Sequence, residues 1–460
     1  MRSINLCSHP RGHRIAQRVS RTNPSWSEHA PLATPVELDM TTATRPLLLA
    51  LRSTLLAAVA CLGFAAQVRA SPEVLVATVP DAHVAQFQRD ICGTTEAEFE
   101  TPQRAEKRGH IFVSIASYRD QACKRTIADL FAKADHPERI TVGVVQQNRA
   151  GSAEDCIAGC ALCAEKQRLG QILVKDYDYT QARGPAFARW AASRLWDGSE
   201  FYLQIDAHSN FQPHWDQSII AQHRALGDPD AILTHHPPAP AQIDTALARG
   251  RTSLNCLSSW DEDGIFQQFS RFVDARGPLP VRSPFAAAGF LFMPARALHE
   301  VPFDPYLVFL FHPEESLLSM RLWTAGFNLY APVRPVISHE YHRVRTPRFY
   351  ERANELQTCR ARAVTRAQYL LGVITRDGVD PAFRAGLDRY GVGHARSLAD
   401  YYAYVGLENP GLTLIDDLGL TAFDQWASGP LAAAVPMGDS APVIKRRCRR
   451  PPAAKMSGRP

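Results

Sequence analysis

The chain has 460 residues, of which 45% are hydrophobic and 21% are charged, and it carries a formal net charge of +5. This composition excludes a fibrous or wholly disordered chain and fits one large globular domain with smaller appendages. The excess positive charge lies in residues 1–72 and 439–460, and the rest of the chain has 36 basic and 42 acidic side chains. An acidic centre without a basic, aromatic-rich stripe argues against a nucleic-acid partner.

The N-terminus reads as a leader followed by a targeting segment. Residues 1–39 are rich in Ser, Pro, His and Arg, which predicts disorder. Residues 40–70 then place two arginines before a Leu/Ala run, the pattern of a signal peptide. The apolar stretch of residues 53–67 is shorter than the roughly 20 residues that span a bilayer, although the Leu-rich part before it could extend a tilted anchor. We therefore expect a signal peptide or signal anchor, hence the secretory pathway or a membrane, and the cytoplasm if this segment is unused.

Strand and helix patterns alternate from residue 110 onward. Apolar, β-branched residues predict strands over 110–120, 139–148, 171–179 and 200–206, and helical spacing predicts helices over 124–134 and 185–196. This order is typical of βαβ units in a parallel sheet, so the fold class is α/β with a Rossmann-like layer. Ligands of such sheets lie outside the carboxyl ends of the strands, and Tyr118, Arg119 and the loop 206–208 should face one crevice.

The rest of the chain is predicted to be less regular. Residues 232–295 are rich in Pro, Gly and polar side chains, which favours long loops, and apolar segments resume after them. We expect the main α/β domain to cover 105–345, a small helical extension to cover 346–426, and a disordered basic tail to cover 427–460.

Ten cysteines occur at irregular spacing, which fits neither a small disulfide scaffold nor paired zinc knuckles. Cys156, Cys160 and Cys163 form a local C-x3-C-x2-C cluster. A structural zinc ion would need a fourth ligand from elsewhere in the chain. Loop thiols or one disulfide are therefore favoured over a zinc site.

A candidate metal site begins at Asp206 and His208, directly after a predicted strand. Residues i and i+2 at a strand end can both face an ion, and a divalent ion that bridges phosphates needs one or two hard protein ligands. For an isolated D-x-H, a turn-forming Asp with an incidental His is the favoured alternative. His339 follows another apolar segment and could supply a further ligand, with a hydrogen-bonded loop histidine as the alternative.

Glu314 and Glu315 form a second candidate site at the predicted start of a helix, where the helix dipole favours carboxylates. Helix capping explains one of them, and the other could orient an acceptor hydroxyl or stabilise positive charge on a sugar. The spacing does not choose between the two. Paired carboxylates also suit glycoside hydrolases, whose catalytic pair flanks the bond about 5–9 Å apart, but neighbours on one helix seldom oppose each other in that way.

A third candidate site lies at Arg183, Gly184 and Pro185, with Arg189 one turn into the following helix. Backbone N–H groups and guanidinium forks at a helix start can hold a diphosphate. Pro185 suits the first turn of a helix. An ordinary loop-to-helix junction with a solvated arginine is the alternative.

Taken together, these motifs resemble one family, the hydroxyproline GlcNAc-transferases of the GT-A fold, known from the enzyme that modifies a subunit of F-box ubiquitin ligases. The resemblance covers residues 110–345 and continues to 396–407. The motifs that carry it are IFVSIASYRD, VGVVQQN, RGPAFAR, YLQIDAHSNF, ILTHHPP, AAGFLFMPA, EESLLSMRLWTAGFNLYAP, SHEYHR and RSLADYYAYVGL.

This resemblance implies an enzyme that transfers GlcNAc from UDP-GlcNAc, with retention, to a hydroxyl group of a protein or peptide. It implies that Asp206, His208 and His339 hold Mn²⁺ or Mg²⁺. By the same likeness Ser114, Tyr118 and Arg119 line the uridine pocket. Arg183 and Gly184, with Asp206, are the other expected donor-binding residues, and Glu314, Glu315 and Arg189 are the expected catalytic residues.

The segment from Glu314 through Arg321 and Trp323 also looks like a loop of polypeptide GalNAc-transferases, which makes Glu314 the first choice among the carboxylates. Two departures flank the site. Pro313 stands where the family has Gly, and Ser209-Asn210 stands where it has Met-Arg. They bear on the choice of acceptor and donor sugar more than on the metal. A glycoside hydrolase and a secreted carbohydrate-binding protein are the alternatives from other classes.

Overall fold

The computed structural model describes residues 102–261, 263–311, 313–343, 346–350 and 357–405. The predicted leader, targeting segment and basic tail lie outside these residues. Within the described part of the chain, every helix is too short or too polar to cross a bilayer.

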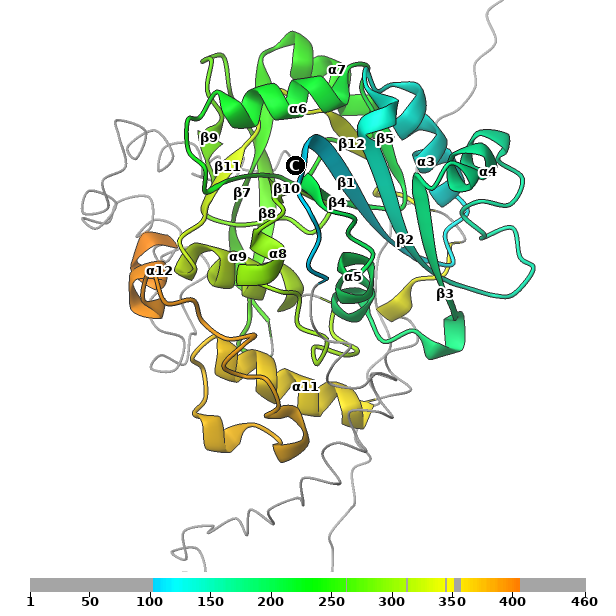
Figure 1. Ribbon diagram of the computed structural model, residues 1–460. Coiled ribbons are helices and arrows are strands. Elements are labelled where there is room, and N and C mark those ends of the chain that lie inside the picture. The colour runs from blue at the N-terminus through cyan, green and yellow to red at the C-terminus, as the bar shows by residue number, and fades with distance from the viewer. Residues whose placement is uncertain (1–101, 262, 312, 344–345, 351–356, 406–460) are drawn as a thin grey trace, which may run out of the picture. The chain divides into compact units, whose positions relative to one another are not determined.

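The centre of the molecule is an eight-stranded sheet (Figure 1). β1 pairs in parallel with β2 and with β4, and β2 pairs in parallel with β3. β10 runs antiparallel between β4 and β6, β11 is parallel to β6, and β9 is antiparallel to β11. The predicted α/β fold with a mainly parallel sheet is therefore confirmed. The strand order is β3 (Ile172–Asp178), β2 (Ile140–Asn148), β1 (Lys107–Tyr118), β4 (Ser199–Asp206), β10 (Phe290–Pro294), β6 (Ala231–Thr234), β11 (Asn328–Ala331) and β9 (Val281–Arg282).

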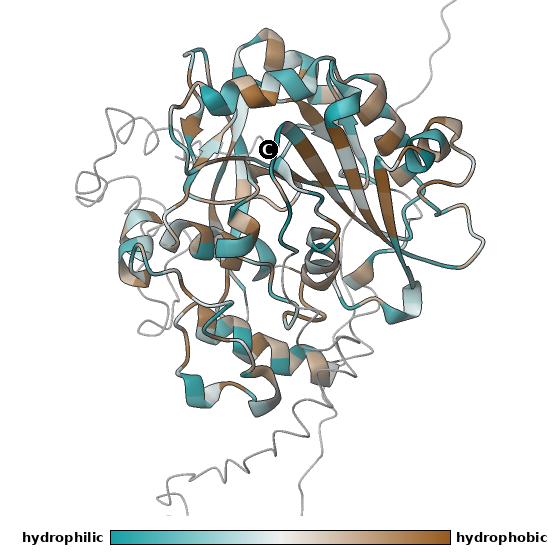
Figure 2. Cartoon of the chain, viewed as in Figure 1, coloured by the Kyte–Doolittle hydropathy of each residue, from teal (hydrophilic) through white to brown (hydrophobic). Residues whose placement is uncertain are grey.

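The sheet is buried on both faces, because parallel strands of this kind are covered by helices. Along β1, Ile111, Val113 and Ile115 belong to one hydrophobic cluster together with helix α3 (Cys123–Ala132). Phe112 belongs to the second cluster, together with helix α5 (Pro185–Ser193). Strands β1 and β2 are accordingly among the most hydrophobic elements (Figure 2). Two further helices, α4 (Ala161–Arg168) and α6 (Trp215–Arg224), complete this half of the chain.

Residues 232–295 differ from the prediction, because much of this region is strand rather than loop. β7 (Arg251–Trp260) and β8 (Phe266–Asp274) pair as an antiparallel two-stranded sheet. Along β8 most side chains are only partly buried, so the strand lacks the long apolar run that marks β1 and β2. Polar, half-exposed strands of this kind give a weak sequence signal. Helix α7 (Pro240–Ala248) precedes them.

The predicted helical extension packs directly on the α/β part. Helices α11 (Gln357–Leu370) and α12 (Leu398–Val405) share a hydrophobic cluster with α9 (Pro313–Thr324), and the short α8 (Ala297–Glu300) lies in the same cluster. Arg366 of α11 is fully buried and its Nε donates to Asp304 Oδ2 at 2.8 Å. Tyr404 of α12 stacks on Trp323 of α9 at 5.2 Å between ring centroids. The extension thus fixes the helix that carries the glutamate pair.

The cysteine cluster forms two disulfides. Cys160 pairs with Cys163, and Cys156 pairs with Cys123, the first residue of α3. The zinc alternative is therefore wrong, since all three cysteines are covalently occupied, and the expectation of one disulfide at most was too low. The second bridge involves a cysteine 33 residues away along the chain, which local spacing does not reveal.

Candidate active site

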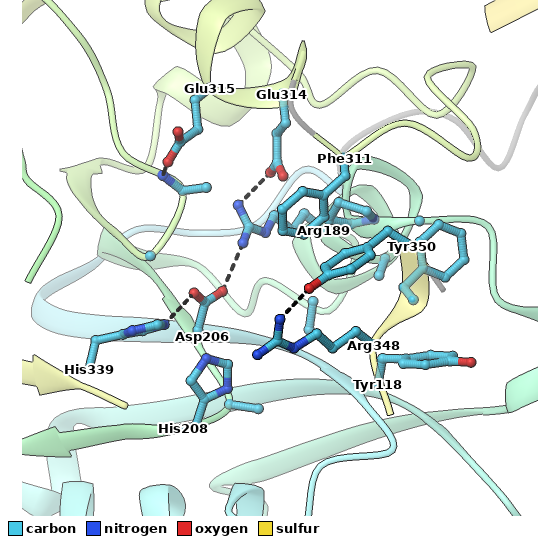
Figure 3. A pocket seen from close by; sticks show the side chains of 18 of the residues that line it. Tyr118, Arg189, Asp206, His208, Phe311, Glu314, Glu315, His339, Arg348 and Tyr350 are labelled. Carbon is cyan, nitrogen blue, oxygen red and sulfur yellow. Dashed lines mark hydrogen bonds and ion pairs between the residues drawn. The ribbon is translucent and has the colours of Figure 1, made fainter. Parts of the chain in front are cut away.

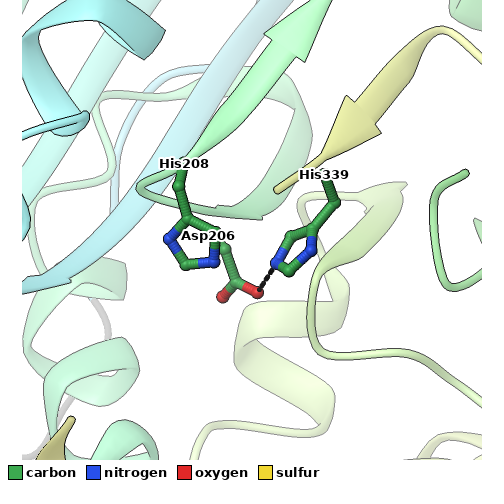
Figure 4. A group of neighbouring side chains, drawn as sticks. All are labelled: Asp206, His208 and His339. Carbon is green, nitrogen blue, oxygen red and sulfur yellow. Dashed lines mark hydrogen bonds and ion pairs between the residues drawn. The ribbon is translucent and has the colours of Figure 1, made fainter. Parts of the chain in front are cut away.

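The carboxyl end of β4 places the first two candidate metal ligands. Asp206 is the last residue of β4, and His208 follows it in the turn before β5 (Ser209–Phe211). β5 pairs antiparallel with β12 (Ile337–His339), and the register sets His339 opposite Ser209. Residues 133 positions apart are thus brought together by one short two-stranded sheet (Figure 4).

The three side chains meet closely enough to share one ion. One ligand atom from each of Asp206, His208 and His339 lies within 4.8 Å of the other two. His339 Nε2 lies 3.0 Å from Asp206 Oδ2, and the two imidazole rings lie 4.4 Å apart between centroids. One carboxylate and two imidazoles are ligands that suit a divalent transition metal such as Mn²⁺. The convergence favours a metal site over an incidental His208, whereas the contact of His339 with Asp206 also fits the hydrogen-bonded loop histidine.

A second layer of contacts orients the candidate ligands. His208 Nδ1 lies 2.8 Å from Asp120 Oδ2, and Arg343 Nη1 donates to the same oxygen at 2.7 Å. A carboxylate on one ring nitrogen fixes an imidazole so that its other nitrogen faces the ion. Burial alone would raise the pKa of Asp206, but the hydrogen bond from His339 and the charge of Arg189 lower it well below its usual value. Burial lowers the pKa of His339. The site therefore offers an ionised carboxylate and a neutral imidazole, the states that bind metal.

Arg189 connects the metal candidates to the glutamate pair (Figure 3). It lies one turn into α5, which begins after Gly184, a residue with a φ of 102°. Arg189 Nη2 donates to Asp206 Oδ1 at 3.0 Å, and Nη1 donates to Glu314 Oε1. Two carboxylates thus share one guanidinium, and when Glu314 is ionised they carry an excess negative charge that a divalent cation would balance. Burial raises the pKa of Glu314 to about 7, with Arg189 opposing and Glu315 and Asp206 adding to the shift.

Glu315 points to different partners. Its Oε1 accepts a hydrogen bond from the backbone N–H of Ala288 at 2.8 Å and lies 2.9 Å from His236 Nε2. Burial opposes the ionised forms of both side chains, but their mutual charge prevails, lowering the pKa of Glu315 and raising the pKa of His236. Glu314 thus faces Arg189, whereas Glu315 holds the turn before β10, a distinction that the sequence left open.

Most of the predicted site residues line one cavity of about 470 Å³. The sequence-predicted residues among its walls are Tyr118, Gly184, Arg189, Asp206, His208, Glu314, Glu315 and His339. A Cβ at Gly184 would lie 3.2 Å from the carbonyl oxygen of Leu310, and the positive φ would strain any other residue. A Cβ at Gly289 would lie 3.2 Å from Asp206 Oδ2, so a larger residue would crowd the carboxylate.

The remaining three predicted donor-binding residues lie outside this lining. Ser114 is buried within β1, four residues from Tyr118, and a strand rises about 3.3 Å per residue, which sets it about 13 Å away. Arg119 pairs with Glu154 at 3.1 Å and lies over the ring of Tyr179. Arg183 lies over the ring of Phe187.

Several residues of the site were absent from the prediction. Asp120, His236 and Arg343 all line the cavity and pair with predicted site residues or their partners. Each lies within a motif that the resemblance already quoted, namely SYRD, THHPP and SHEYHR. A charged or imidazole side chain inside such a motif is therefore the sequence feature that could have identified these three residues as part of the site. The aromatic residues Phe311, Phe349 and Tyr350 also line the cavity and had no such signal.

The α/β fold and the charged cavity at the carboxyl end of β4 suit a glycosyltransferase, and a comparison with known families shows that class. A family model described as "Glycosyltransferase (GlcNAc)" matches residues 110–172 and 160–410, and the chain belongs to this family. The match extends to residue 410 and therefore covers the helical extension with α11 and α12.

Two solved structures are similar at low identity. The crystal structure of GalNAc-T7 with UDP, GalNAc and Mn²⁺ is 13% identical, and the match covers 73% of this chain and 66% of that chain with a TM-score of 0.42. The mannosyltransferase PcManGT from Pyrobaculum calidifontis, in complex with GDP-Man and Mn²⁺, is 12% identical, with 80% and 88% coverage and a TM-score of 0.32. The chain thus spans just under two thirds of the GalNAc-T7 chain. No curated protein matches it in sequence.

Proposed function

We propose that this enzyme transfers GlcNAc from UDP-GlcNAc, with retention and with the aid of Mn²⁺ or Mg²⁺, to a hydroxyl group of a protein or peptide. Hydroxyproline is the acceptor residue that the sequence resemblance suggests. The observation that carries the proposal is the meeting of Asp206, His208 and His339 within 4.8 Å, beside the Arg189–Glu314 pair in one cavity.

The walls of the cavity suit a nucleotide diphosphate only if a cation is present. A diphosphate would add negative charge beside Asp206 and Glu314, which already share the charge of Arg189. When bound, the divalent ion would neutralise the charge that develops on the leaving phosphate. Arg189 would add a positive charge whose position is fixed in advance by its two carboxylate partners.

In the proposed reaction the acceptor oxygen forms a bond to C1 of the sugar while the bond from C1 to the phosphate oxygen breaks. The hydroxyl proton passes to the leaving phosphate, on the same face of the sugar, so that the configuration at C1 is retained. Glu314 is held by Arg189 and lies in the cavity wall, which suits a residue that orients the acceptor hydroxyl. Glu315 is engaged by Ala288 and His236, which suits a positioning residue.

The first test measures UDP release from a panel of nucleotide sugars with Mn²⁺, with Mg²⁺ and with a chelator. We expect UDP-GlcNAc with a divalent ion to give the highest rate and the chelator to abolish it. Asp206→Ala should abolish transfer, while Asp244→Ala, which changes an exposed carboxylate outside the cavity, should not. Full UDP release in the chelator would reject the metal assignment, and sugar release without a nucleotide would replace the proposal with a glycoside hydrolase.

We also propose that the enzyme works in an oxidising compartment, such as the lumen of a secretory organelle. Two disulfides, Cys123–Cys156 and Cys160–Cys163, support this location, because disulfides are rare where glutathione keeps thiols reduced. Fractionation of cells that produce the full chain tests it. Recovery of the enzyme in the cytosol with free thiols would reject it.

A further inference from the structure

The mouth of the cavity is unusually apolar for an exposed surface. Among the residues that the structure describes, five large hydrophobic side chains are exposed, and three of them line this cavity. These are Phe311, Tyr341 and Tyr350, exposed by 47%, 44% and 39%. Apolar side chains gathered at one opening mark a binding surface, whereas single exposed ones need no explanation. Leu169 and Leu279, the other two, lie outside the lining.

Two of these residues form an aromatic rim, defined here as Phe311 and Tyr350. Their rings meet edge to face at 5.3 Å between centroids, although 39 positions separate them along the chain. Phe349 lies behind them and packs on Tyr118 at 5.7 Å and on Phe309 at 6.2 Å. Arg348 donates a hydrogen bond to the hydroxyl of Tyr350 (Figure 3). The rim is therefore held by the contact between its two rings and by Arg348. Tyr341 is tied instead to the metal side, through its ring contact with His339.

The aromatic rim is placed to contact the acceptor rather than the nucleotide-sugar donor. A cavity of about 470 Å³ is the size that one small ligand fills. The side chains proposed to bind the metal ion and the diphosphate are buried or contact a buried polar side chain. They are Asp206, His208, His339 and Arg189. Phe311 stands three residues before Glu314, the residue proposed to orient the acceptor hydroxyl. The rim and Glu314 thus belong to the same cavity wall, where an acceptor held by Glu314 could contact the rim.

A further part of the cavity wall favours a polypeptide as the acceptor. Gln267 and Gln268 of β8 line the same cavity. Within the described part of the chain β8 pairs with β7 alone, and Ser316 of α9 donates to the carbonyl of Phe266 on β8. The rest of its outer edge can offer backbone groups to an extended segment. An extended peptide along β8 could place one side chain against the rim while an adjacent residue presents its hydroxyl.

On the basis of the proposed function, we propose that Phe311 and Tyr350 are an acceptor subsite that binds the apolar side chain or ring of a peptide residue next to the hydroxyl-bearing residue. The subsite determines which peptides are glycosylated and takes no part in breaking the sugar–phosphate bond. Stacking and edge-to-face contacts between rings supply the selectivity.

The test uses short synthetic peptides with one hydroxyproline, Ser or Thr, flanked either by Pro, Leu or Phe or by Gly and Asn. UDP release and product mass are followed with UDP-GlcNAc and Mn²⁺. Wild-type enzyme should prefer the apolar flanks. Phe311→Ala and Tyr350→Ala should each raise the KM for the acceptor about tenfold more than they raise the KM for the donor. Phe311→Trp keeps an aromatic ring and should retain the preference for apolar flanks. Leu279→Ala, which removes an equally exposed side chain outside the cavity, should match the wild type.

Other outcomes separate the two proposals. Equal changes in donor and acceptor KM would assign the rim to the nucleotide and overturn the subsite. Faster transfer to free mono- or disaccharides than to any peptide would overturn the peptide class. Failure of the wild type to release UDP from any nucleotide sugar, even as slow hydrolysis in water, would instead reject the glycosyltransferase proposal itself. Melting temperatures of both alanine variants verify folding, and the two changes lie on separate segments, so that one remains informative if the other unfolds.

Discussion

The floor and the mouth of the cavity are built from opposite chemistry. On the floor, Asp206 and Glu314 are joined by Arg189, and His339 closes on Asp206 from a distant strand. At the mouth, Phe311 and Tyr350 present exposed rings to solvent. Paired charges in a buried site are costly to rearrange, so the floor is fixed in advance for one reaction. Exposed rings can meet many partners. The contrast implies that chemistry resides in the floor and acceptor choice in the mouth.

The strongest test of the floor is to remove a metal ligand. His339→Ala should lower kcat/KM by at least about 1000-fold and abolish Mn²⁺ binding, because two of three ligand groups cannot hold the ion beside a diphosphate. Calorimetric titration with Mn²⁺ and the UDP-release assay measure both effects. His214→Ala changes an exposed imidazole and serves as the control. Wild-type Mn²⁺ affinity in His339→Ala would show that the convergence of the three side chains is not a metal site.

The next largest effect is expected at Arg189. Arg189→Ala should lower kcat by about 100- to 1000-fold, because it removes a preorganised positive charge and leaves Asp206 and Glu314 facing each other. Arg189→Lys should recover only part of this loss, since an ammonium group does not reproduce the two-pronged geometry of the guanidinium. Arg194→Ala, at the end of the same helix, is the matched control. An Arg189→Lys enzyme with full kcat would remove the electrostatic role.

Glu314 makes the stability of the metal-free enzyme depend on pH. Its raised pKa means that the folded state keeps a proton which the unfolded chain releases between pH 4.5 and about 7. The resulting stability is fully present below pH 4.5 and is lost as the pH rises to 7, by roughly 3 kcal/mol. Glu314→Gln should lack this component. Urea unfolding of both proteins at pH 5 and pH 7.5, in a chelator, measures the difference, with Glu165→Gln on exposed α4 as the control. Parallel pH profiles for wild type and Glu314→Gln would reject the shift.

The sequence predicts the structure best where a long apolar strand is followed by polar residues. The strands that end at Tyr118 and Asp206 were predicted within a few residues, because strands buried on both faces are continuously hydrophobic. The half-exposed strand β8 has no continuous apolar run, so the sequence predicts a loop there. The motifs mark Asp120 and His236 as candidates, but their roles depend on partners 88 and 79 positions away, which the sequence does not reveal. The role of Ser114 stays a prediction, since a motif fixes the strand but not how far along it a ligand reaches.

The smallest expected effect separates the two adjacent glutamates. Glu315→Gln keeps an acceptor for the N–H of Ala288 but loses the charge that pairs with His236, so kcat/KM should fall by only about tenfold, as for outer-shell residues. His236→Gln should cost a similar amount. The double variant should lose little more than either single one, because both changes break the same pair. Losses that multiply in the double variant would mean that Glu315 and His236 act separately on the substrate. A loss in Glu315→Gln as large as that of Arg189→Ala would place Glu315 on the floor with Glu314.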